Sequence, residues 1–171
     1  MFKFIPHIIN LLAVQKEVVI LDWGGGAGEA ANALAKQLRH AKVQNVKIYV
    51  LSDLYFTQWH RNEKSITYIY GDYRDLAKYN LPQVDFVFSH FGLWHLETDD
   101  LIDHFRELRG LLRPGARVIY NTRKHVEKDL IDLTFWYDIK ERRGDFSPVF
   151  TITLKQNGSF IYTSVETVKY D

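Results

Sequence analysis

Residues 18–31, which read VVILDWGGGAGEAA, constrain the fold more than any other part of the chain. Their apolar beginning predicts a buried strand that ends near Asp22, and a helix is predicted to start at Glu29. The connection carries glycines at alternate positions, Gly24, Gly26 and Gly28. Glycine lets a turn adopt positive φ and lets a ligand approach the backbone, and a helix start offers free N–H groups. The segment therefore predicts a ligand-binding unit of strand, turn and helix.

Two ligand motifs overlap at this turn. Residues 26–31 fit the dinucleotide pattern G-x-G-x-x-G/A. Asp22 and the three glycines instead give the pattern D-x-G-x-G-x-G. A carboxylate at the end of the strand would repel a pyrophosphate, whereas it would attract a cationic ligand. The charge of Asp22 thus favours a ligand with positive groups over a dinucleotide, and a glycine turn without any ligand is the third interpretation.

The composition bounds the class of protein. The chain has 171 residues, 46% of them hydrophobic and 25% charged, which predicts a single globular domain with a sizeable core. A net charge of +1 gives no general attraction for nucleic acid or anionic membranes. The absence of cysteine excludes disulfides, thiolate metal ligands and a cysteine nucleophile, and it fits a reducing, cytoplasmic location.

The N-terminal segment has one apolar stretch, residues 8–14, which is too short to span a membrane. Pro6 precedes this stretch and is predicted to be the first residue of a short helix that covers the sheet. We therefore expect no membrane association for this segment.

Strand and helix signals alternate along the chain. Strands are predicted at 18–22, 46–52, 66–70, 84–89 and 116–121, and helices at 29–39 and 100–112. A sharp turn at 113–115 is expected before the fifth of these strands. Two further β-rich runs, 149–154 and 160–168, flank an Asn-Gly pair, which is a strong hairpin signal. The pattern predicts an α/β fold with a Rossmann-like, doubly wound and mostly parallel seven-stranded sheet that ends in an antiparallel C-terminal hairpin.

With these features in order, residues 18–121 resemble the class I methyltransferases that depend on S-adenosylmethionine (SAM). SAM carries an ammonium and a sulfonium but no phosphate, which agrees with the charge of Asp22. In the run LRGLLRPGARVI, Ala116 replaces the second glycine of the family's L-x-P-G-G turn. We expect one domain over 1–171, with an N-terminal helix in 1–17, the cofactor-binding core in 18–121, and a helix and the hairpin in 122–171.

The resemblance implies a set of cofactor-binding residues. Asp53 would accept hydrogen bonds from the ribose hydroxyls, and Asp72 would accept one from the adenine amino group. Tyr73 would stack on the cofactor or offer its backbone N–H. The implied set is Asp22, Gly24, Gly26, Gly28, Asp53, Asp72, Tyr73 and Ser89. Both Asp53 and Asp72 have an alternative role as caps of a turn or helix.

Two histidines after the fourth strand, His90 and His95, are the candidate general bases because histidine titrates near neutral pH. Ser89 and His90 are expected at the carboxyl end of the strand, near the sulfonium. The alternative for either histidine is a pocket-lining or capping role. The spacing of His90, His95 and Glu97 matches no common metal site, so we expect no metal.

The resulting hypothesis is methyl transfer from SAM to a small-molecule acceptor, with methylation of oxygen, nitrogen or carbon left open. A non-catalytic SAM-binding or methyltransferase-like partner subunit is the main alternative. An RNA methyltransferase is disfavoured because acidic residues are interspersed among the basic ones in the second half of the chain. An NAD-dependent oxidoreductase is disfavoured by Asp22 and by the terminal hairpin.

Little sequence flanks the predicted core, so we expect an open acceptor site. A protein partner or a second copy of the chain in a homodimer would cover it. Alternatively, the segments 55–64 and 124–148 would close over it. The lid candidates in these two segments are Trp59, His60, Trp136 and Tyr137.

Overall fold

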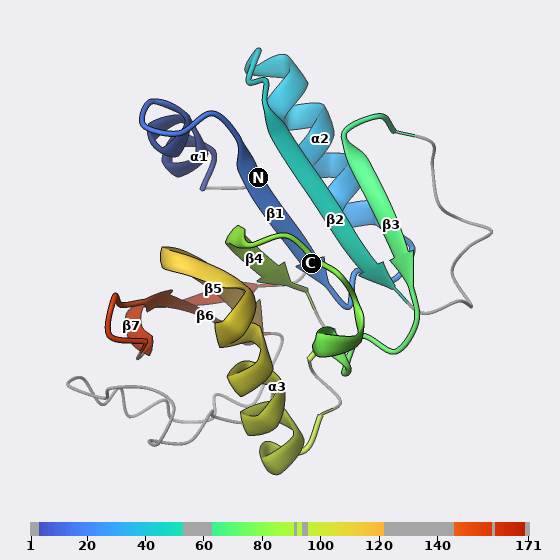
Figure 1. Ribbon diagram of the computed structural model, residues 1–171, viewed down its shortest axis with the longest axis vertical. Coiled ribbons are helices and arrows are strands. Elements are labelled where there is room, and N and C mark those ends of the chain that lie inside the picture. The colour runs from blue at the N-terminus through green and yellow to red at the C-terminus, as the bar shows by residue number, and fades with distance from the viewer. Residues whose placement is uncertain are drawn as a thin grey trace.

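The computed structural model describes residues 4–52, 63–90, 92–93, 96–121, 146–158 and 160–169. Seven strands and three α-helices follow one another in these residues, with one short 3-10 helix, η2 (Figure 1). In chain order they are α1 (Ile5–Leu12), β1 (Val18–Trp23), α2 (Glu29–His40), β2 (Val46–Ser52), β3 (Ile66–Tyr70), η2 (Leu76–Lys78), β4 (Val84–Ser89), α3 (Thr98–Leu111), β5 (Leu112–Asn121), β6 (Phe146–Leu154) and β7 (Phe160–Lys169).

The strands form one sheet in the order β3-β2-β1-β4-β5-β6-β7. The strands β1 to β5 pair in parallel, whereas β6 is antiparallel to both of its neighbours, β5 and β7. This arrangement confirms the predicted α/β fold and its terminal hairpin. The strand order reverses between β1 and β4, and in such sheets ligands bind outside the carboxyl ends of the strands at this point.

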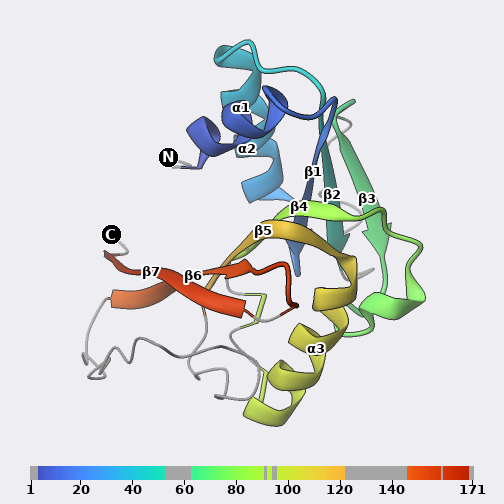
Figure 2. The ribbon, with the colours of Figure 1, turned by 60° about the vertical axis from the view of Figure 1, so that its left-hand side comes forward.

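Helices cover both faces of the sheet (Figure 2). Alternate residues of β1 point to opposite faces, so that Val18 and Ile20 belong to the core under α1 and α2, while Val19, Leu21 and Trp23 belong to the core under α3 and η2. All six residues of β1 are buried, as expected for a central strand of a doubly wound sheet.

The N-terminal helix α1 packs on the first of these faces, as predicted. Ile8 is fully buried there, and the ring of Phe4 stacks on Phe86 with 4.2 Å between the ring centroids. The helix begins at Ile5, so Pro6 is its second residue rather than its first. The missing N–H of proline costs nothing at either position, because the first N–H groups of a helix have no partner within the helix.

The segment around Arg113 differs from the prediction. β5 begins at Leu112 rather than at residue 116, and its pairing shifts from Val84↔Leu112 to Phe86↔Arg117. Residues 113–116 therefore form a bulge within the strand and not a turn before it. The physical reason is an ion pair: Arg113 reaches back from the bulge to the carboxylate of Asp85 at 3.0 Å.

The terminal hairpin turns where the sequence predicts it. The N–H of Gly158 donates to the carbonyl oxygen of Lys155 at 3.0 Å, and Gly158 has a φ of 82°. The paired strands are longer than predicted, because β6 already begins at Phe146 and β7 continues to Lys169. The hairpin therefore covers the edge of β5 over most of the residues that pair in parallel with β4.

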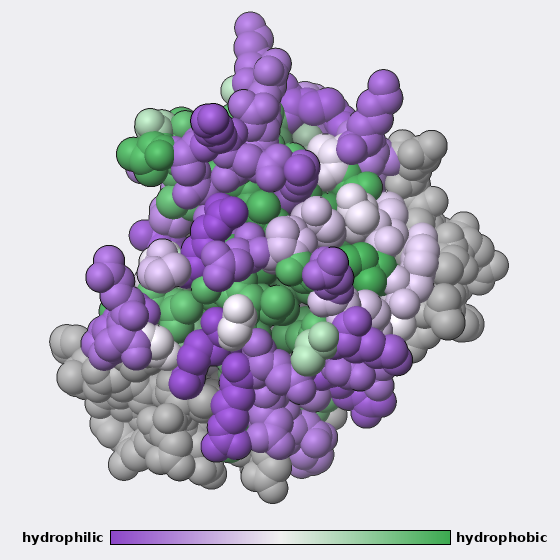
Figure 3. Space-filling model, viewed as in Figure 1, coloured by the Kyte–Doolittle hydropathy of each residue, from purple (hydrophilic) through white to green (hydrophobic). Residues whose placement is uncertain are grey.

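On the face shown in Figure 3, hydrophobic residues gather across the middle of the molecule, with hydrophilic residues above and below them. The large hydrophobic side chains that are exposed in the described part of the chain are Ile9, Val14 and Tyr70. None of the described helices has the length and apolar character needed to cross a membrane.

Candidate cofactor site

The glycine turn between β1 and α2 has a backbone that requires glycine. Gly24, Gly26 and Gly28 have φ values of 71°, 50° and 75°, in the left-handed region. Space is also lacking, since a β-carbon on Gly24 would lie 2.9 Å from the Cα of Gly92, and one on Gly28 would lie 2.7 Å from Cε1 of Tyr68. The motif glycines thus fit the close backbone approach that a bound cofactor needs.

The turn is anchored to the end of β2. The N–H of Gly25 donates to the carbonyl oxygen of Leu51 at 3.0 Å, and Oγ of Ser52 donates to the carbonyl oxygen of Gly26 at 2.6 Å. Within the turn, the N–H of Gly28 donates to the carbonyl oxygen of Gly25 at 2.8 Å. The neighbouring strand therefore fixes the shape of the turn before any ligand binds.

Asp22 lies beneath this turn and is 1% exposed. The backbone N–H of Ala31, near the start of α2, donates to its carboxylate, whereas Oδ2 has no hydrogen-bond partner in the part of the chain that the structure describes. A β-carbon on Gly25 would lie 2.7 Å from this oxygen. Burial raises the pKa of Asp22 to about 8, against the smaller lowering effect of the Ala31 N–H. With this pKa, Asp22 carries a proton at neutral pH in the unliganded protein, and a cationic group beside its unpartnered Oδ2 would favour the ionised form. Asp22 therefore fits the ammonium of SAM, directly or through a bridging water.

Tyr73 lies against the same turn. The indole Nε1 of Trp23, the last residue of β1, donates to the carbonyl oxygen of Tyr73 at 2.7 Å. A β-carbon on Gly24 would lie 3.6 Å from Cδ2 of the Tyr73 ring. The structure thus brings Tyr73 together with the glycine motif, and its role toward the cofactor stays a prediction.

Asp72 precedes Tyr73 and is paired with Arg74. The guanidinium Nε of Arg74 donates to Oδ1 at 2.8 Å and its Nη2 to Oδ2 at 2.7 Å. This pairing holds the pKa of Asp72 at about 2, so its carboxylate is ionised at neutral pH. The side chain of Asp72 remains 44% exposed, which leaves it accessible to a ligand.

Ser89 and His90 lie at the carboxyl end of β4, beside β1. Ser89 is 3% exposed, and its Oγ has no hydrogen-bond partner among the described residues. A β-carbon on Gly92 would lie 2.8 Å from this Oγ and 2.6 Å from the carbonyl oxygen of Trp23. His90 is exposed, but desolvation by the neighbouring chain lowers its pKa, so that it is neutral at pH 7 and able to accept a proton.

Some predicted site residues lie outside the described residues. They are Asp53, His95 and the lid candidates Trp59, His60, Trp136 and Tyr137. Conversely, sequence reasoning missed Asn32, Tyr68 and Gly92, which contact the turn or its neighbours. A lone glycine two residues after His90 was a usable signal for Gly92, and an asparagine within an alanine-rich helix start was one for Asn32.

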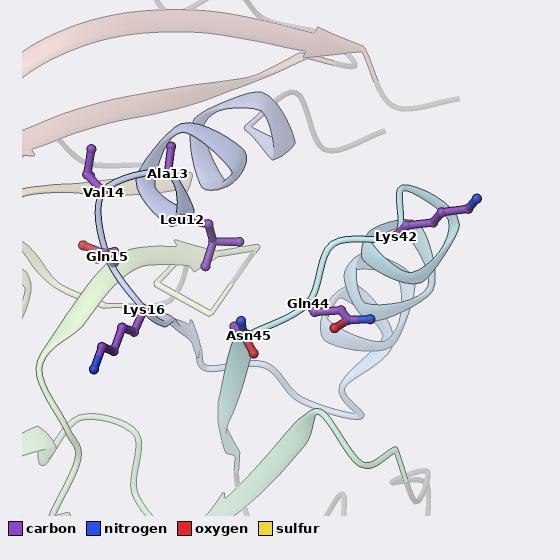
Figure 4. Close-up of a pocket in the computed structure, with 8 residues that line it drawn as sticks. All are labelled: Leu12, Ala13, Val14, Gln15, Lys16, Lys42, Gln44 and Asn45. Atoms are coloured by element: carbon purple, nitrogen blue, oxygen red, sulfur yellow. The ribbon is translucent and has the colours of Figure 1, made fainter.

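An open pocket lies at the opposite end of the sheet (Figure 4). It is lined by Leu12–Lys16 after α1 and by Lys42, Gln44 and Asn45 after α2. These segments precede the amino ends of β1 and β2. Because cofactors of doubly wound sheets bind at the carboxyl ends, this pocket is separate from the candidate site.

The fold, with its glycine turn between β1 and α2, defines a Rossmann-like domain. Residues 21–120 match the family model described as methyltransferase domain, so the chain belongs to that family. This result confirms the expected class and SAM as the cofactor of that class. No curated protein matches the chain significantly.

Solved structures with this fold include the CcbJ methyltransferase from Streptomyces caelestis, with 16% identity, a TM-score of 0.52, and coverage of 96% of this chain and 71% of CcbJ. Another is CalS10 from Micromonospora echinaspora, described as an amino pentose methyltransferase of calicheamicin biosynthesis, with 12% identity, a TM-score of 0.52, and coverage of 97% and 75%. A methyltransferase described from an antibiotic biosynthesis pathway of Anabaena variabilis has 26% identity and a TM-score of 0.49 over 70% of this chain. The chain spans only 44% of that protein.

Proposed function

We propose that this chain transfers a methyl group from SAM to a small-molecule acceptor. The observation that carries the proposal is the meeting of three features at one end of the sheet: the left-handed glycine turn, the unpartnered carboxyl oxygen of Asp22 and the buried hydroxyl of Ser89. A dinucleotide would bring an anionic pyrophosphate to the same turn, and ionisation of Asp22 would repel it, whereas the ammonium of SAM would favour that ionisation.

Bound SAM would supply an already activated methyl group, so the protein chiefly has to bind and orient the two reactants. Asp22 would accept the ammonium of the cofactor, directly or through water. Asp72 would accept the adenine amino group, and Asp53 the ribose hydroxyls. His90, held neutral by its lowered pKa, would take the proton that the acceptor loses, and His95 is the second candidate for this role.

Support for a small acceptor comes from the proteins that share the fold. CalS10 is described as an amino pentose methyltransferase and covers nearly the whole of this chain. In addition, the net charge of +1 gives the chain no general attraction for nucleic acid. A sugar-sized or similarly compact nucleophile therefore fits better than RNA.

The first test is calorimetric titration of the protein with S-adenosylhomocysteine (SAH), with NADH as the control. We expect binding of SAH in the micromolar range, a free energy of about −8 kcal/mol, and no binding of NADH. Binding of NADH alone would overturn the assignment of the cofactor.

The second test separates an enzyme from a non-catalytic SAM-binding subunit. The protein is incubated with SAM and a panel of amino sugars, phenols and small amines, and SAH release is measured, with a structured RNA in parallel. We expect release with a small acceptor and none with RNA. Binding of SAH without release in any mixture would favour the non-catalytic subunit. Light scattering with and without SAH would then test whether a homodimer covers the site.

A further inference from the structure

Tyr68, in the edge strand β3, lies directly against the start of α2. A β-carbon on Gly28 would lie 2.7 Å from Cε1 of Tyr68 and 2.8 Å from its hydroxyl oxygen. The edge of this ring therefore occupies the space that any side chain at position 28 would need. The contact ties the cofactor turn to a strand on the far side of β2.

Asn32 connects the Tyr68 hydroxyl to the backbone of the turn. Its Nδ2 donates to the carbonyl oxygen of Gly28 at 2.7 Å and to the hydroxyl oxygen of Tyr68 at 2.9 Å. The same carbonyl oxygen also accepts the backbone N–H of Asn32 at 2.9 Å. One residue thus binds the Gly28 carbonyl twice, and the tyrosine fixes the direction of the amide group that does so.

This arrangement compensates for an unusual helix start. Gly28 is the N-cap of α2, and it has left-handed dihedral angles, φ 75° and ψ 18°, with no side chain to cap the helix. An N-cap is normally extended and uses its own side-chain oxygen. Here the Asn32 side-chain amide, which also donates to Tyr68, binds the Gly28 carbonyl in addition to the ordinary backbone hydrogen bond of the helix.

Helix formation alone does not account for Asn32. Asparagine is a weaker helix former than alanine, and Ala30, Ala31 and Ala33 surround it in the first turns of α2. An alanine at position 32 would favour the helix but would leave the Gly28 carbonyl with one hydrogen bond fewer.

We propose that Tyr68 and Asn32 are positioning residues for the cofactor, which hold the Gly28 peptide in the orientation that binds SAM. The inference rests on the proposed function, because it assigns these residues to the same site. Neither residue has to touch the reacting atoms, and both act through the backbone of the turn.

The test uses Tyr68→Phe, which removes one hydroxyl, and Asn32→Ala, which removes the amide. Tyr49→Phe is the matched control, because Tyr49 is also a partly buried tyrosine but packs against the core on the opposite face, under α3. Binding of SAH is measured by calorimetry, and hydrogen exchange of the Gly28 and Asn32 amides is measured in the unliganded proteins.

We expect both variants to bind SAH about three- to tenfold more weakly than the wild type, which corresponds to the loss of one hydrogen bond. Exchange of the two amides should accelerate by a similar factor, while Tyr49→Phe changes neither quantity. The double variant should bind no more weakly than Asn32→Ala, because the two residues act through one carbonyl. The unfolding midpoint of Asn32→Ala should stay close to that of the wild type although its affinity for SAH falls, because alanine favours the helix.

Unchanged SAH affinity in both variants, with a wild type that binds SAH, would overturn this inference and leave the proposed function standing. Affinity losses that add in the double variant would also overturn it, since the residues would then act separately. A wild type that does not bind SAH would instead refute the proposed function. If, in that case, the Gly28 and Asn32 amides also exchanged at the wild-type rate in both variants, the positioning of Gly28 would be refuted as well.

Discussion

Arg113 donates through Nη1 to both carboxylate oxygens of Asp85, each at 3.0 Å. Asp85 is 4% exposed, and its Oδ2 also accepts the backbone N–H of Val19 at 2.8 Å. This N–H belongs to β1 just before the pairing with β4 begins at Ile20. A single carboxylate therefore joins β1, β4 and the bulge of β5 at the amino end of the sheet, far from the cofactor turn.

We predict that Asp85→Ala lowers the free energy of unfolding by about 2–4 kcal/mol, because it leaves a buried N–H and a half-buried guanidinium without their partner. Urea unfolding measures the change. Asp103→Ala, which removes an exposed pair with Arg106, is the control and should cost less than about 1 kcal/mol. Equal losses in the two variants would contradict the structural role of Asp85.

Gly24→Ala should weaken SAH binding by at least about tenfold, a cost of roughly 1.4 kcal/mol. The added β-carbon meets the Cα of Gly92 at 2.9 Å and sits on a backbone with φ 71°. The control is Gly110→Ala in α3, where a β-carbon meets nothing within 4 Å. This control should bind SAH normally and gain up to about 1 kcal/mol of stability. Normal affinity in Gly24→Ala would show that the ligand does not approach this turn.

The raised pKa of Asp22 predicts a pH-dependent stability. The folded protein keeps this proton up to about pH 8, whereas the unfolded chain releases it near the ordinary aspartate pKa of about 4. Between these values the unfolded state binds fewer protons, so the contribution of Asp22 to the free energy of unfolding falls as the pH rises and is fully lost above about 8.

Asp22→Asn removes this titration, so the variant should gain stability relative to the wild type as the pH rises through this window. Urea unfolding of both proteins without cofactor, at several pH values, measures the difference. A difference that stays constant with pH would mean that Asp22 titrates normally in the folded state.

His90→Ala should lower kcat by about 10²–10⁴, the usual contribution of a general base, with little change in SAH affinity. In the wild type, the rate should fall on acidification only below the ordinary histidine pKa, because desolvation lowers the pKa of His90. The same measurement on His95→Ala decides between the two candidates. An unchanged kcat in His90→Ala would exclude that residue as the base.

The strands and the cofactor turn could be predicted because local signals fix them. Gly71 and Asp72 follow β3 and mark its end in the sequence, and the alternation of strands and helices implies a parallel sheet. The bulge at Arg113 could not be predicted in this way, because it depends on an ion pair with Asp85, 28 positions away. Local pattern showed only proline and glycine there, which normally indicate a turn.

The same limit applies to the site. Asp22, Tyr73 and Ser89 were predicted and lie at the carboxyl end of the sheet beside the turn. The partners that shape the turn, Asn32 and Tyr68, were not predicted. They meet only because β3 lies beside β2 and α2 packs over both strands, which no short motif encodes.

The close approach of Gly24 to Gly92 has a consequence for how such a chain can evolve. The two positions are far apart in the sequence, yet neither tolerates a side chain unless β1 and β4 separate at their ends. They are therefore constrained jointly, and a change at one cannot be rescued by shrinking the other, which is already glycine.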